Sequence, residues 1–428
     1  MACCSISRRG HIVSGSVTGR GALTRSSGTR RAPSRSSPGD AREGNVLGPH
    51  RPHPLGSVEV AEIEIGIGKS GRRGYALDDI TVVPTRRTRD PEDIDLSWAI
   101  EGYRNELPYL ASALDAVVSP GRAVEIAKLG GLGVLNLEGL WTRYEDPEPW
   151  FERIAAAPDE TAAGVLRQAY AEPVKAELVT ERIRQIASAG VVTCASLTPQ
   201  RTAEFAKAVV DAELDLLVVQ GVVVSAEHVS KSQEPLNLKR FIREYDIPVI
   251  VGGCTSYHAA LHLMRTGAVG VLVGVGSGDA STTASVLGIG APQATAIADA
   301  AAARSRHLEE TGVYAQVIAD GGMNKGGDLT KAIACGADSV VLGTALAASE
   351  GAPGRGYAWG MTAFHPTLPR GTRVQVEPAG TLEEILVGPA RTSDGRANLF
   401  GALRAAMAMC GYQTIREFHK ADVVTRER

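Results

Sequence analysis

The stretch AQVIADGGMNKGGDLTKAIACGADSVVLGTAL (315–346) decides the fold, because it holds an apolar run, a helical segment and a second apolar run. The first run ends at Gly321 and Gly322, and the second leads into Gly343 and Thr344. Neither run alternates polar with apolar residues, which is typical of parallel strands buried on both faces. The stretch therefore predicts a strand–helix–strand unit of a parallel sheet.

The same alternation extends back to residue 107 and gives eight strands. The predicted strands are 107–114, 133–137, 191–197, 214–221, 247–254, 269–278, 315–322 and 339–346. The predicted helices are 119–129, 178–189, 200–211, 235–244, 256–266, 292–310, 327–335 and 398–410. Eight such units in one chain favour a single (β/α)8 TIM barrel, with a doubly wound open sheet as the alternative.

Two long segments interrupt the repeat. Residues 138–177 connect the second strand to the next helix, and residues 347–397 follow the eighth strand. The second segment is rich in Gly, Pro and Arg. Loops of this length in a compact domain are usually functional, and on a barrel this one would lie at the catalytic end. We therefore expect 347–397 to form a flap over the site.

Composition excludes several classes of protein. The chain of 428 residues is 44% hydrophobic and carries a formal charge of -3, which argues against a nucleic-acid-binding core. No apolar run approaches the roughly 20 residues of a membrane helix. The six cysteines form no CxxC pair, which favours a reducing, cytoplasmic compartment. Residues 1–57 are rich in Arg, Ser, Gly and Pro, and we expect a disordered extension, a mis-assigned start or a transit peptide there. Residues 58–428 would form the barrel domain.

Several loops have the composition of binding sites. ADGG (319–322) and LGT (342–344) follow the seventh and eighth strands, where barrels commonly bind phosphate. Glycines let backbone N–H groups approach an anion, and Asp320 suits sugar hydroxyls. The loop GVGSGDASTTASVLGIGAPQ (274–293) is rich in Gly and then in hydroxyl groups, and its carbonyls could hold a monovalent cation. From composition alone, tight turns and a flexible linker explain these loops equally well.

Together these motifs resemble the IMP dehydrogenase/GMP reductase family. The matching segments, in family order, are LDDITVVP (77–84), ASALDAVVS (111–119), KLGGLGVLN (128–136), VGVGSGDASTT (273–283), VIADGGMNKGGDLTKAIACGADSVVLGTALA (317–347), WGM (359–361) and FGALRAAMAMCGYQTIREF (400–418). The resemblance implies a TIM barrel, often tetrameric, that binds a purine nucleotide and NAD(P). The segment 138–177 is too short for the regulatory CBS pair, so the chain is most similar to the IMP dehydrogenase-related branch that lacks it.

The resemblance also implies roles for individual residues. Substrate-binding roles go to Ser112, Asp320, Gly322, Gly343, Thr344, Gly360 and Met361. Catalytic roles go to Ser281, Thr283 and Arg370. A monovalent cation, potassium in this family, would be held by backbone carbonyls of Gly276, Gly278 and Ser281.

The chain departs from the family pattern at the reacting positions. Ser281 replaces the nucleophilic Cys, and a hydroxyl needs a base to attack the purine C2 as a thiolate does. Asp279 replaces a phosphate-contacting Ser, and its charge would repel that anion. The expected Asp and Asn after the fourth and fifth strands are Gln220 and Cys254. The Met of the first motif is Leu114, and the base-recognising Glu is Arg370. The family's Arg-Tyr pair that activates water is also absent from this sequence, and Arg370 or Arg373 could substitute for it.

Several functions remain open on this sequence. The first is NAD-dependent oxidation of IMP to XMP in guanine nucleotide biosynthesis. The second is a non-catalytic, nucleotide-binding or regulatory relative that has lost the Cys. GMP reduction is a third, and a flavin-binding barrel oxidoreductase is a fourth because ADGG and LGT are generic. We expect a purine nucleotide as partner, no nucleic acid, no membrane and a homotetramer.

Overall fold

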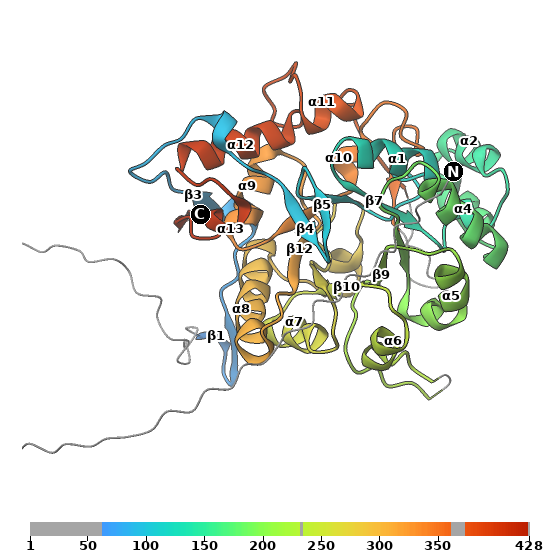
Figure 1. Ribbon diagram of the computed structural model, residues 1–428, viewed down its shortest axis with the longest axis horizontal. Helices are drawn as coiled ribbons and strands as arrows, with labels where there is room; N and C mark the ends of the chain where they lie inside the picture. The colour runs from blue at the N-terminus through green and yellow to red at the C-terminus, as the bar shows by residue number, and fades with distance from the viewer. Residues whose placement is uncertain (1–61, 232–233, 361–372, 427–428) are drawn as a thin grey trace, which may run out of the picture. The chain divides into compact units, whose positions relative to one another are not determined.

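The computed structural model describes residues 62–231, 234–360 and 373–426, and at its centre eight parallel strands form a closed barrel (Figure 1). The predicted extension 1–57 lies outside the described residues. The last strand pairs with the first, with Val340 opposite Tyr109, which closes the barrel. The strands are β6 (Tyr109–Ala111), β7 (Leu132–Asn136), β8 (Cys194–Leu197), β9 (Leu216–Gln220), β10 (Val249–Cys254), β11 (Gly270–Val273), β12 (Gln316–Asp320) and β13 (Ser339–Leu342). The TIM barrel predicted from the sequence is confirmed.

Eight helices follow the eight strands and surround the barrel (Figure 1). They are α1 (Pro120–Lys128), α4 (Ala176–Ala187), α5 (Pro199–Asp211), α6 (Leu238–Glu244), α7 (Tyr257–Met264), α8 (Gln293–Thr311), α9 (Gly326–Ala334) and α12 (Leu399–Met409). Each matches a predicted helix to within about three residues. Ser119 begins α1 by accepting a hydrogen bond from the backbone N–H of Arg122, as an N-cap does.

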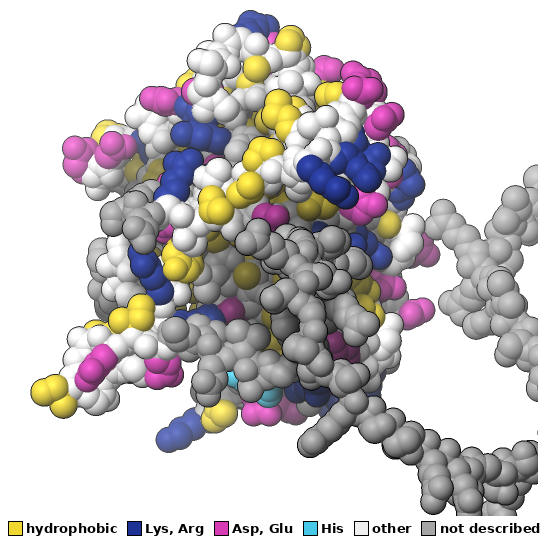
Figure 2. Space-filling model, turned by 90° about the vertical axis from the view of Figure 1, so that its left-hand side faces the viewer, with side chains coloured by type: hydrophobic (Ala, Val, Ile, Leu, Met, Phe, Trp, Pro, Cys, Tyr) yellow, Lys and Arg dark blue, Asp and Glu magenta, His cyan; other side chains and the backbone are white. Residues whose placement is uncertain are grey.

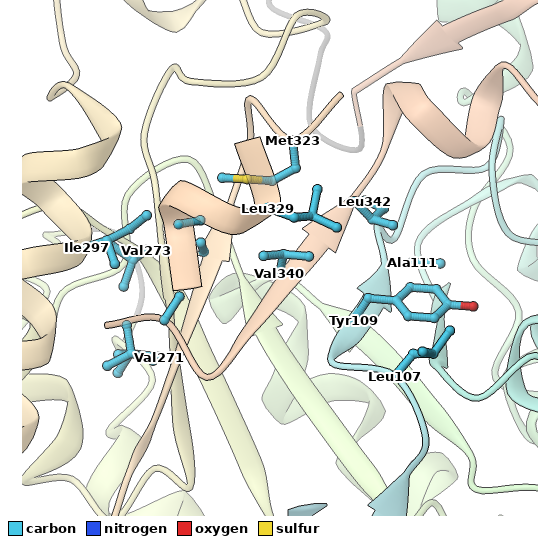
Figure 3. Close-up of a cluster of buried hydrophobic side chains, with 14 of the residues drawn as sticks. Leu107, Tyr109, Ala111, Val271, Val273, Ile297, Met323, Leu329, Val340 and Leu342 are labelled. Atoms are coloured by element: carbon cyan, nitrogen blue, oxygen red, sulfur yellow. The ribbon is translucent and has the colours of Figure 1, made fainter. Parts of the chain in front are cut away.

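The strands bury both faces, which explains their unbroken apolar sequences. Alternate residues point into the barrel or out to the helices, because side chains alternate along a strand. The inward set includes Leu110, Leu132, Ile250 and Ile318, and all are nearly or fully buried. Figure 3 shows part of the outward layer, where side chains of β11 and β13 lie beside α8 and α9 and side chains of β6 continue the same layer. The labelled residues are Leu107, Tyr109, Ala111, Val271, Val273, Ile297, Met323, Leu329, Val340 and Leu342.

A hairpin closes the amino-terminal end of the barrel. It consists of β4 (Trp98–Ile100) and β5 (Tyr103–Asn105), which pair antiparallel. The indole N–H of Trp98 donates to Oε1 of Gln316 at 3.1 Å, at the first residue of β12. Tyr103 donates its hydroxyl to Asp215 at 3.0 Å. Only the carboxyl ends of the strands therefore remain open to a ligand among the described residues.

The two long segments contain structure of their own. Residues 138–177 contain two helices that were not predicted, α2 (Glu148–Ala156) and α3 (Asp159–Ala169). Residues 347–397 contain the antiparallel pair β14 (Tyr357–Trp359) and β15 (Arg373–Gln375) and the helix α11 (Leu382–Leu386). Smaller elements are α10 (Thr344–Ala347), α13 (Ile415–Phe418), the hairpin of β1 (Glu62–Gly66) and β2 (Lys69–Arg72), and the pair of β3 (Ile80–Val82) and β16 (Val423–Thr425).

Several predicted strands were too long, and the sixth extended furthest beyond its observed end. The sixth strand was expected over 269–278, but β11 ends at Val273. Gly274 and Gly276 have φ angles of 154° and 76°, so the backbone leaves the extended conformation there. A Cβ atom on Gly274 would lie 1.9 Å from the carbonyl oxygen of Asp320. Glycine at 274 thus lets the loop after β11 pass directly over the end of β12.

On the face drawn in Figure 2, the Lys and Arg side chains of the described residues form no continuous basic strip. There the Lys and Arg side chains of the described residues lie among Asp and Glu side chains. No helix among the described residues is long and apolar enough to cross a membrane.

Candidate active site

A cavity of about 200 Å³ lies at the carboxyl ends of the barrel strands. Its walls come from the loops after β6, β9, β11, β12 and β13. Ten of the predicted site residues line it: Ser112, Gly276, Gly278, Ser281, Thr283, Asp320, Gly322, Gly343, Thr344 and Gly360. The other two, Met361 and Arg370, lie outside the described residues. The barrel thus brings together residues separated by up to 248 positions in the chain, from Ser112 to Gly360.

Asp320 is the last residue of β12, and its carboxylate faces Gln220 at the end of β9. Nε2 of Gln220 donates to Oδ2 of Asp320 at 3.1 Å. Burial raises the pKa of Asp320 to about 6, and the hydrogen bond from Gln220 offsets part of that rise. At neutral pH the carboxylate is therefore ionised and can accept two hydroxyl hydrogen bonds, as a ribose 2′,3′-diol would offer.

The loop after β11 is fastened to the end of β12. The hydroxyl of Ser277 donates to the carbonyl oxygen of Asp320 at 2.8 Å. The side-chain amide of Gln293, at the start of α8, donates to the carbonyl of Val273 at 2.7 Å and to that of Asp320 at 3.3 Å. These contacts fix the loop that carries Ser281 relative to Asp320.

Ser281 is exposed, while Thr283 is buried beneath it. The Ser281 hydroxyl donates to Oγ1 of Thr283 at 3.2 Å, and its oxygen accepts from the Thr283 backbone N–H at 3.3 Å. The Ser281 N–H donates to the carbonyl of Gly278 at 2.9 Å. None of these partners is a base, so within the described part of the chain nothing activates the Ser281 hydroxyl.

Asp279 and Cys254 are two positions at which the chain departs from the family pattern, and only Asp279 lines the cavity. Asp279 lines the cavity, and its Oδ2 accepts a hydrogen bond from Nδ2 of Asn324 at 2.6 Å. Cys254 is buried at the end of β10, where its thiol donates to the carbonyl of Leu272. Burial raises the pKa of Cys254 to about 12, so this thiol stays protonated and cannot substitute for the missing nucleophile.

The insertion formed by α2 and α3 contacts the antiparallel pair of β14 and β15. The indole N–H of Trp359 donates to the Tyr170 hydroxyl at 2.8 Å, and that hydroxyl in turn donates to Asp115. Burial raises the pKa of Asp115 to about 6. Trp359 immediately precedes Gly360, so this network supports one wall of the cavity.

Arg373 belongs to this support and not to the reacting centre. Its guanidinium donates to the carbonyl oxygens of Ile154, Ala155 and Ala157 at the end of α2, and it stacks 3.7 Å from the ring centre of Tyr357. The side chain is 2% exposed. Arg373, considered as a substitute for the water-activating Arg of the family, does not line the cavity described above, because its guanidinium contacts the end of α2.

A second cavity, of about 470 Å³, lies beside the first. Val222 lines the first cavity, and the next residue, Val223, lines the second. The second cavity is bounded by α5 and α6 and by aromatic and basic side chains, among them Phe241, Tyr245 and Arg240. Together the two cavities offer adjacent room for two ligand groups.

The described residues contain no group of three or more His, Cys, Asp or Glu side chains that could hold a metal ion. His258 and His262 are both exposed on α7. A cation at the loop after β11 would therefore depend on backbone carbonyls, of which that of Gly278 already accepts a hydrogen bond from Ser281.

Comparison with known proteins places the chain in a family. A sequence profile of the IMP dehydrogenase / GMP reductase domain matches residues 74–427. The chain belongs to the IMP dehydrogenase/GMP reductase family. Its sequence is 48% identical over 370 residues to an uncharacterized oxidoreductase of Mycolicibacterium smegmatis, covering 84% of this chain and 99% of that one. It is 24% identical to the inosine-5'-monophosphate dehydrogenase of Methanocaldococcus jannaschii, covering 82% and 92% of the two chains.

A solved structure supports the same assignment. It is the crystal structure of an IMP dehydrogenase/GMP reductase-like protein from Corynebacterium glutamicum, which superposes with a TM-score of 0.81. That protein is 44% identical, and the match covers 85% of this chain and 98% of that chain. The family resemblance expected from the motifs is therefore confirmed, and the chain is similar to oxidoreductases.

Some contacts of the site were not anticipated from the sequence. Gln220 was noted as a departure, but its hydrogen bond to Asp320 was not expected. Asn324, Tyr170 and the role of Arg373 were missed. Only their positions in the sequence could have drawn attention to them. Asn324 lies in the loop after a strand, and Tyr170 and Arg373 lie in the two long segments that interrupt the strand–helix repeat.

Proposed function

We propose that this protein binds IMP in the cavity at the carboxyl end of the barrel and oxidises it to XMP with NAD. The observation that carries the proposal is the convergence of Asp320, Thr344 and Ser281 on one cavity. Asp320 would accept the ribose hydroxyls, while the backbone N–H groups of Gly343 and Thr344 would face the phosphate. In this position the purine base would extend toward Ser281.

The proposed chemistry uses Ser281 as the nucleophile. Its O–H would add across the C2–N3 double bond of the purine, with the oxygen bonding to C2 and the proton passing to N3. After the hydride has left C2, N3 would release its proton to solvent. Water would then add to C2 and break the bond between C2 and Oγ, giving one proton back to the Ser281 oxygen and one to N3, and XMP would be released. When bound, NAD supplies the acceptor for that hydride. The hydrogen bond between Ser281 and Thr283 orients the hydroxyl, but it removes no proton. Slow turnover is therefore expected, because a hydroxyl without a base is a weak nucleophile.

The second cavity fits the remaining part of NAD. A dinucleotide needs two adjoining sites, and Val222 and Val223 place the two cavities next to each other. Phe241 and Tyr245 offer aromatic faces on which an adenine could stack, and Arg240 offers charge to a phosphate. We also propose a potassium ion at the carbonyls of Gly276, Gly278 and Ser281, and a cytoplasmic homotetramer in guanine nucleotide biosynthesis.

A second candidate function is nucleotide binding without catalysis. The absence of a base beside Ser281 among the described residues favours it. GMP reduction is weaker as a candidate, because it also requires the missing Cys.

The test is NADH formation by the purified chain with IMP, NAD and potassium. Ser281→Ala is the variant, and Ser285→Ala is the matched control because Ser285 lines neither cavity and donates only to Thr282. Turnover that is lost in Ser281→Ala and kept in Ser285→Ala is the expected result. No turnover in the wild-type chain, with IMP still bound, would favour the non-catalytic function.

A further inference from the structure

A small apolar core, separate from that of the barrel, joins the α2–α3 insertion to β14. Its buried members are Ala116, Leu140, Phe151, Ile154, Leu166, Ala169 and Trp359. Trp359 is 1% exposed, and its ring centre lies 6.1 Å from that of Phe151 in α2. Gly360, the next residue, lines the first cavity, at the carboxyl ends of the barrel strands. At this point a wall of the first cavity is therefore continuous with the core of the insertion.

The hydrogen bonds that start from this core can run in only one direction. An indole N–H is a donor only, so the Tyr170 hydroxyl must accept from Trp359. The Tyr170 hydroxyl donates its single proton to the Asp115 carboxylate. Asp115 is 1% exposed, and it also accepts from the backbone N–H of Leu140 at 2.9 Å. Because a hydrogen bond to an ionised carboxylate is stronger than one between neutral groups, Tyr170 connects Trp359 firmly to Asp115.

Asp115 and Trp359 adjoin two different walls of the first cavity. Asp115 directly follows Leu114, which lines the cavity in the loop after β6. Trp359 directly precedes Gly360, which lines the cavity at the end of β14. The Tyr170 hydroxyl is thus a bridge of two hydrogen bonds between the loop after β6 and β14. A change in the position of that hydroxyl changes the spacing of the two walls.

Further contacts fasten β14 and β15 at other points. Arg373 in β15 donates to carbonyl oxygens at the end of α2. Arg355 forms exposed ion pairs with α2, which contribute little because water screens them. The backbone N–H of Gly354 donates to the carbonyl of Ala116 at 3.0 Å, but Gly354 lies before β14 and outside the cavity lining. Tyr170 therefore makes the link that adjoins the cavity residues themselves.

We propose that Tyr170 is a positioning residue for the ligand of the first cavity, because its hydroxyl sets the spacing between the wall at Leu114 and the wall at Gly360. The identity of that ligand as IMP rests on the proposed function, whereas the coupling of the two walls rests on the contacts alone. The loop that carries the nucleophile is attached elsewhere, to the end of β12 through Ser277 and Gln293. Loss of the Tyr170 hydroxyl therefore weakens binding of the ligand and leaves the chemical step unchanged.

The first part of the test is hydrogen–deuterium exchange of the full chain without ligand. Tyr170→Phe removes only the hydroxyl, and Tyr144→Phe is the matched control because the Tyr144 hydroxyl donates to the carbonyl of Ala169 within the insertion. We expect Tyr170→Phe to speed exchange in β14 and β15 about tenfold, or about 1.4 kcal/mol, and to leave the barrel strands unchanged. Unchanged exchange in β14, or an equal acceleration in Tyr144→Phe, would overturn the inference whether or not IMP binds.

The second part measures the Kd of IMP by calorimetric titration, and KM and kcat by NADH formation. In Tyr170→Phe the Kd and KM should rise about tenfold, or about 1.4 kcal/mol, with kcat unchanged, while Tyr144→Phe should match the wild type. Trp359→Phe should weaken IMP by a similar factor, and the double variant by no more than either single variant, because both changes break the same link.

The outcomes separate this inference from the proposed function. An unchanged Kd in Tyr170→Phe, a fall in kcat at unchanged KM, or losses that multiply in the double variant would overturn the positioning role and leave the proposed function standing. If the wild-type chain binds IMP without oxidising it, the Kd values alone decide the positioning role. If the wild-type chain binds no IMP while exchange in β14 responds to Tyr170→Phe, the proposed function is overturned and the coupling of the two walls stands.

Discussion

Ionisation of Asp320 should control the affinity for the nucleoside part of the ligand. Burial raises the pKa of this carboxyl to about 6, from about 3.9 for an exposed Asp. Because the ionised form accepts the ribose hydroxyls, binding should be complete above that pKa and should be lost as the pH falls through it.

The expected size of the effect follows from the ionised fraction. At about pH 5, one unit below the pKa, only about one molecule in eleven carries the carboxylate, so the apparent dissociation constant should be about elevenfold higher than at about pH 7.5. Inosine is the right ligand, because a nucleotide phosphate itself titrates near pH 6. The assay is calorimetric titration of the full chain with inosine across this range.

Three variants make the prediction specific. Asp320→Asn keeps the shape of the side chain and should abolish the pH dependence. Asp115→Asn is the control for the midpoint of the pH profile, because burial also raises the pKa of Asp115 to about 6, yet this residue lies outside the cavity lining. Since Asp115 supports the wall at Gly360 through Tyr170 and Trp359, the midpoint and not the absolute affinity of this variant is compared. Gln220→Leu removes the hydrogen bond that lowers the Asp320 pKa, so the midpoint should move to higher pH. Binding independent of pH in the wild type, or an unchanged profile in Asp320→Asn, would refute the reasoning.

The remaining predictions concern charge, support and the nucleophile. Asp279→Asn should bind IMP several-fold more tightly than the wild type and inosine equally well, because the variant removes a negative charge from the phosphate end of the cavity. Calorimetric titration with both ligands measures this, and an affinity for IMP equal to that of the wild type would contradict it. Arg373→Met should lower the free energy of unfolding by about 4 kcal/mol, since it leaves three carbonyls without a donor at about 1 kcal/mol each and removes a cation–π contact of about 1 kcal/mol. Urea denaturation measures that loss, and Arg355→Met, which breaks only exposed ion pairs, should cost under about 1 kcal/mol. Ser281→Cys should raise the rate of IMP oxidation, because a thiol ionises nearer neutral pH than a hydroxyl. If Ser281→Cys and Ser285→Cys oxidise IMP at the same rate, Ser281 is not the nucleophile.

The barrel could be predicted from the sequence because its strands are buried on both faces. Each therefore appears as a short apolar run, such as SVVL (339–342), and eight runs separated by helices leave few alternatives. The two helices of 138–177 were missed because the segment interrupts the strand–helix repeat. Their signal was nevertheless present, since Phe151 and Ile154 are spaced as on one helix face, and both are buried.

The members of the site could be predicted, but their contacts could not. Asp320 and Thr344 follow strands in Gly-rich loops, and in a barrel such loops meet at one end. The hydrogen bonds from Gln220 to Asp320 and from Asn324 to Asp279 join residues 100 and 45 positions apart. No local pattern encodes such pairs, because they depend on which loops the closed barrel places side by side.

The most direct test of the central claim is a crystal structure of the chain with IMP. We predict that the ribose hydroxyls lie within hydrogen-bonding distance of the Asp320 carboxylate, with the phosphate at Thr344 and the purine facing Ser281. IMP bound at another place on the barrel, or with its ribose away from Asp320, would contradict the account.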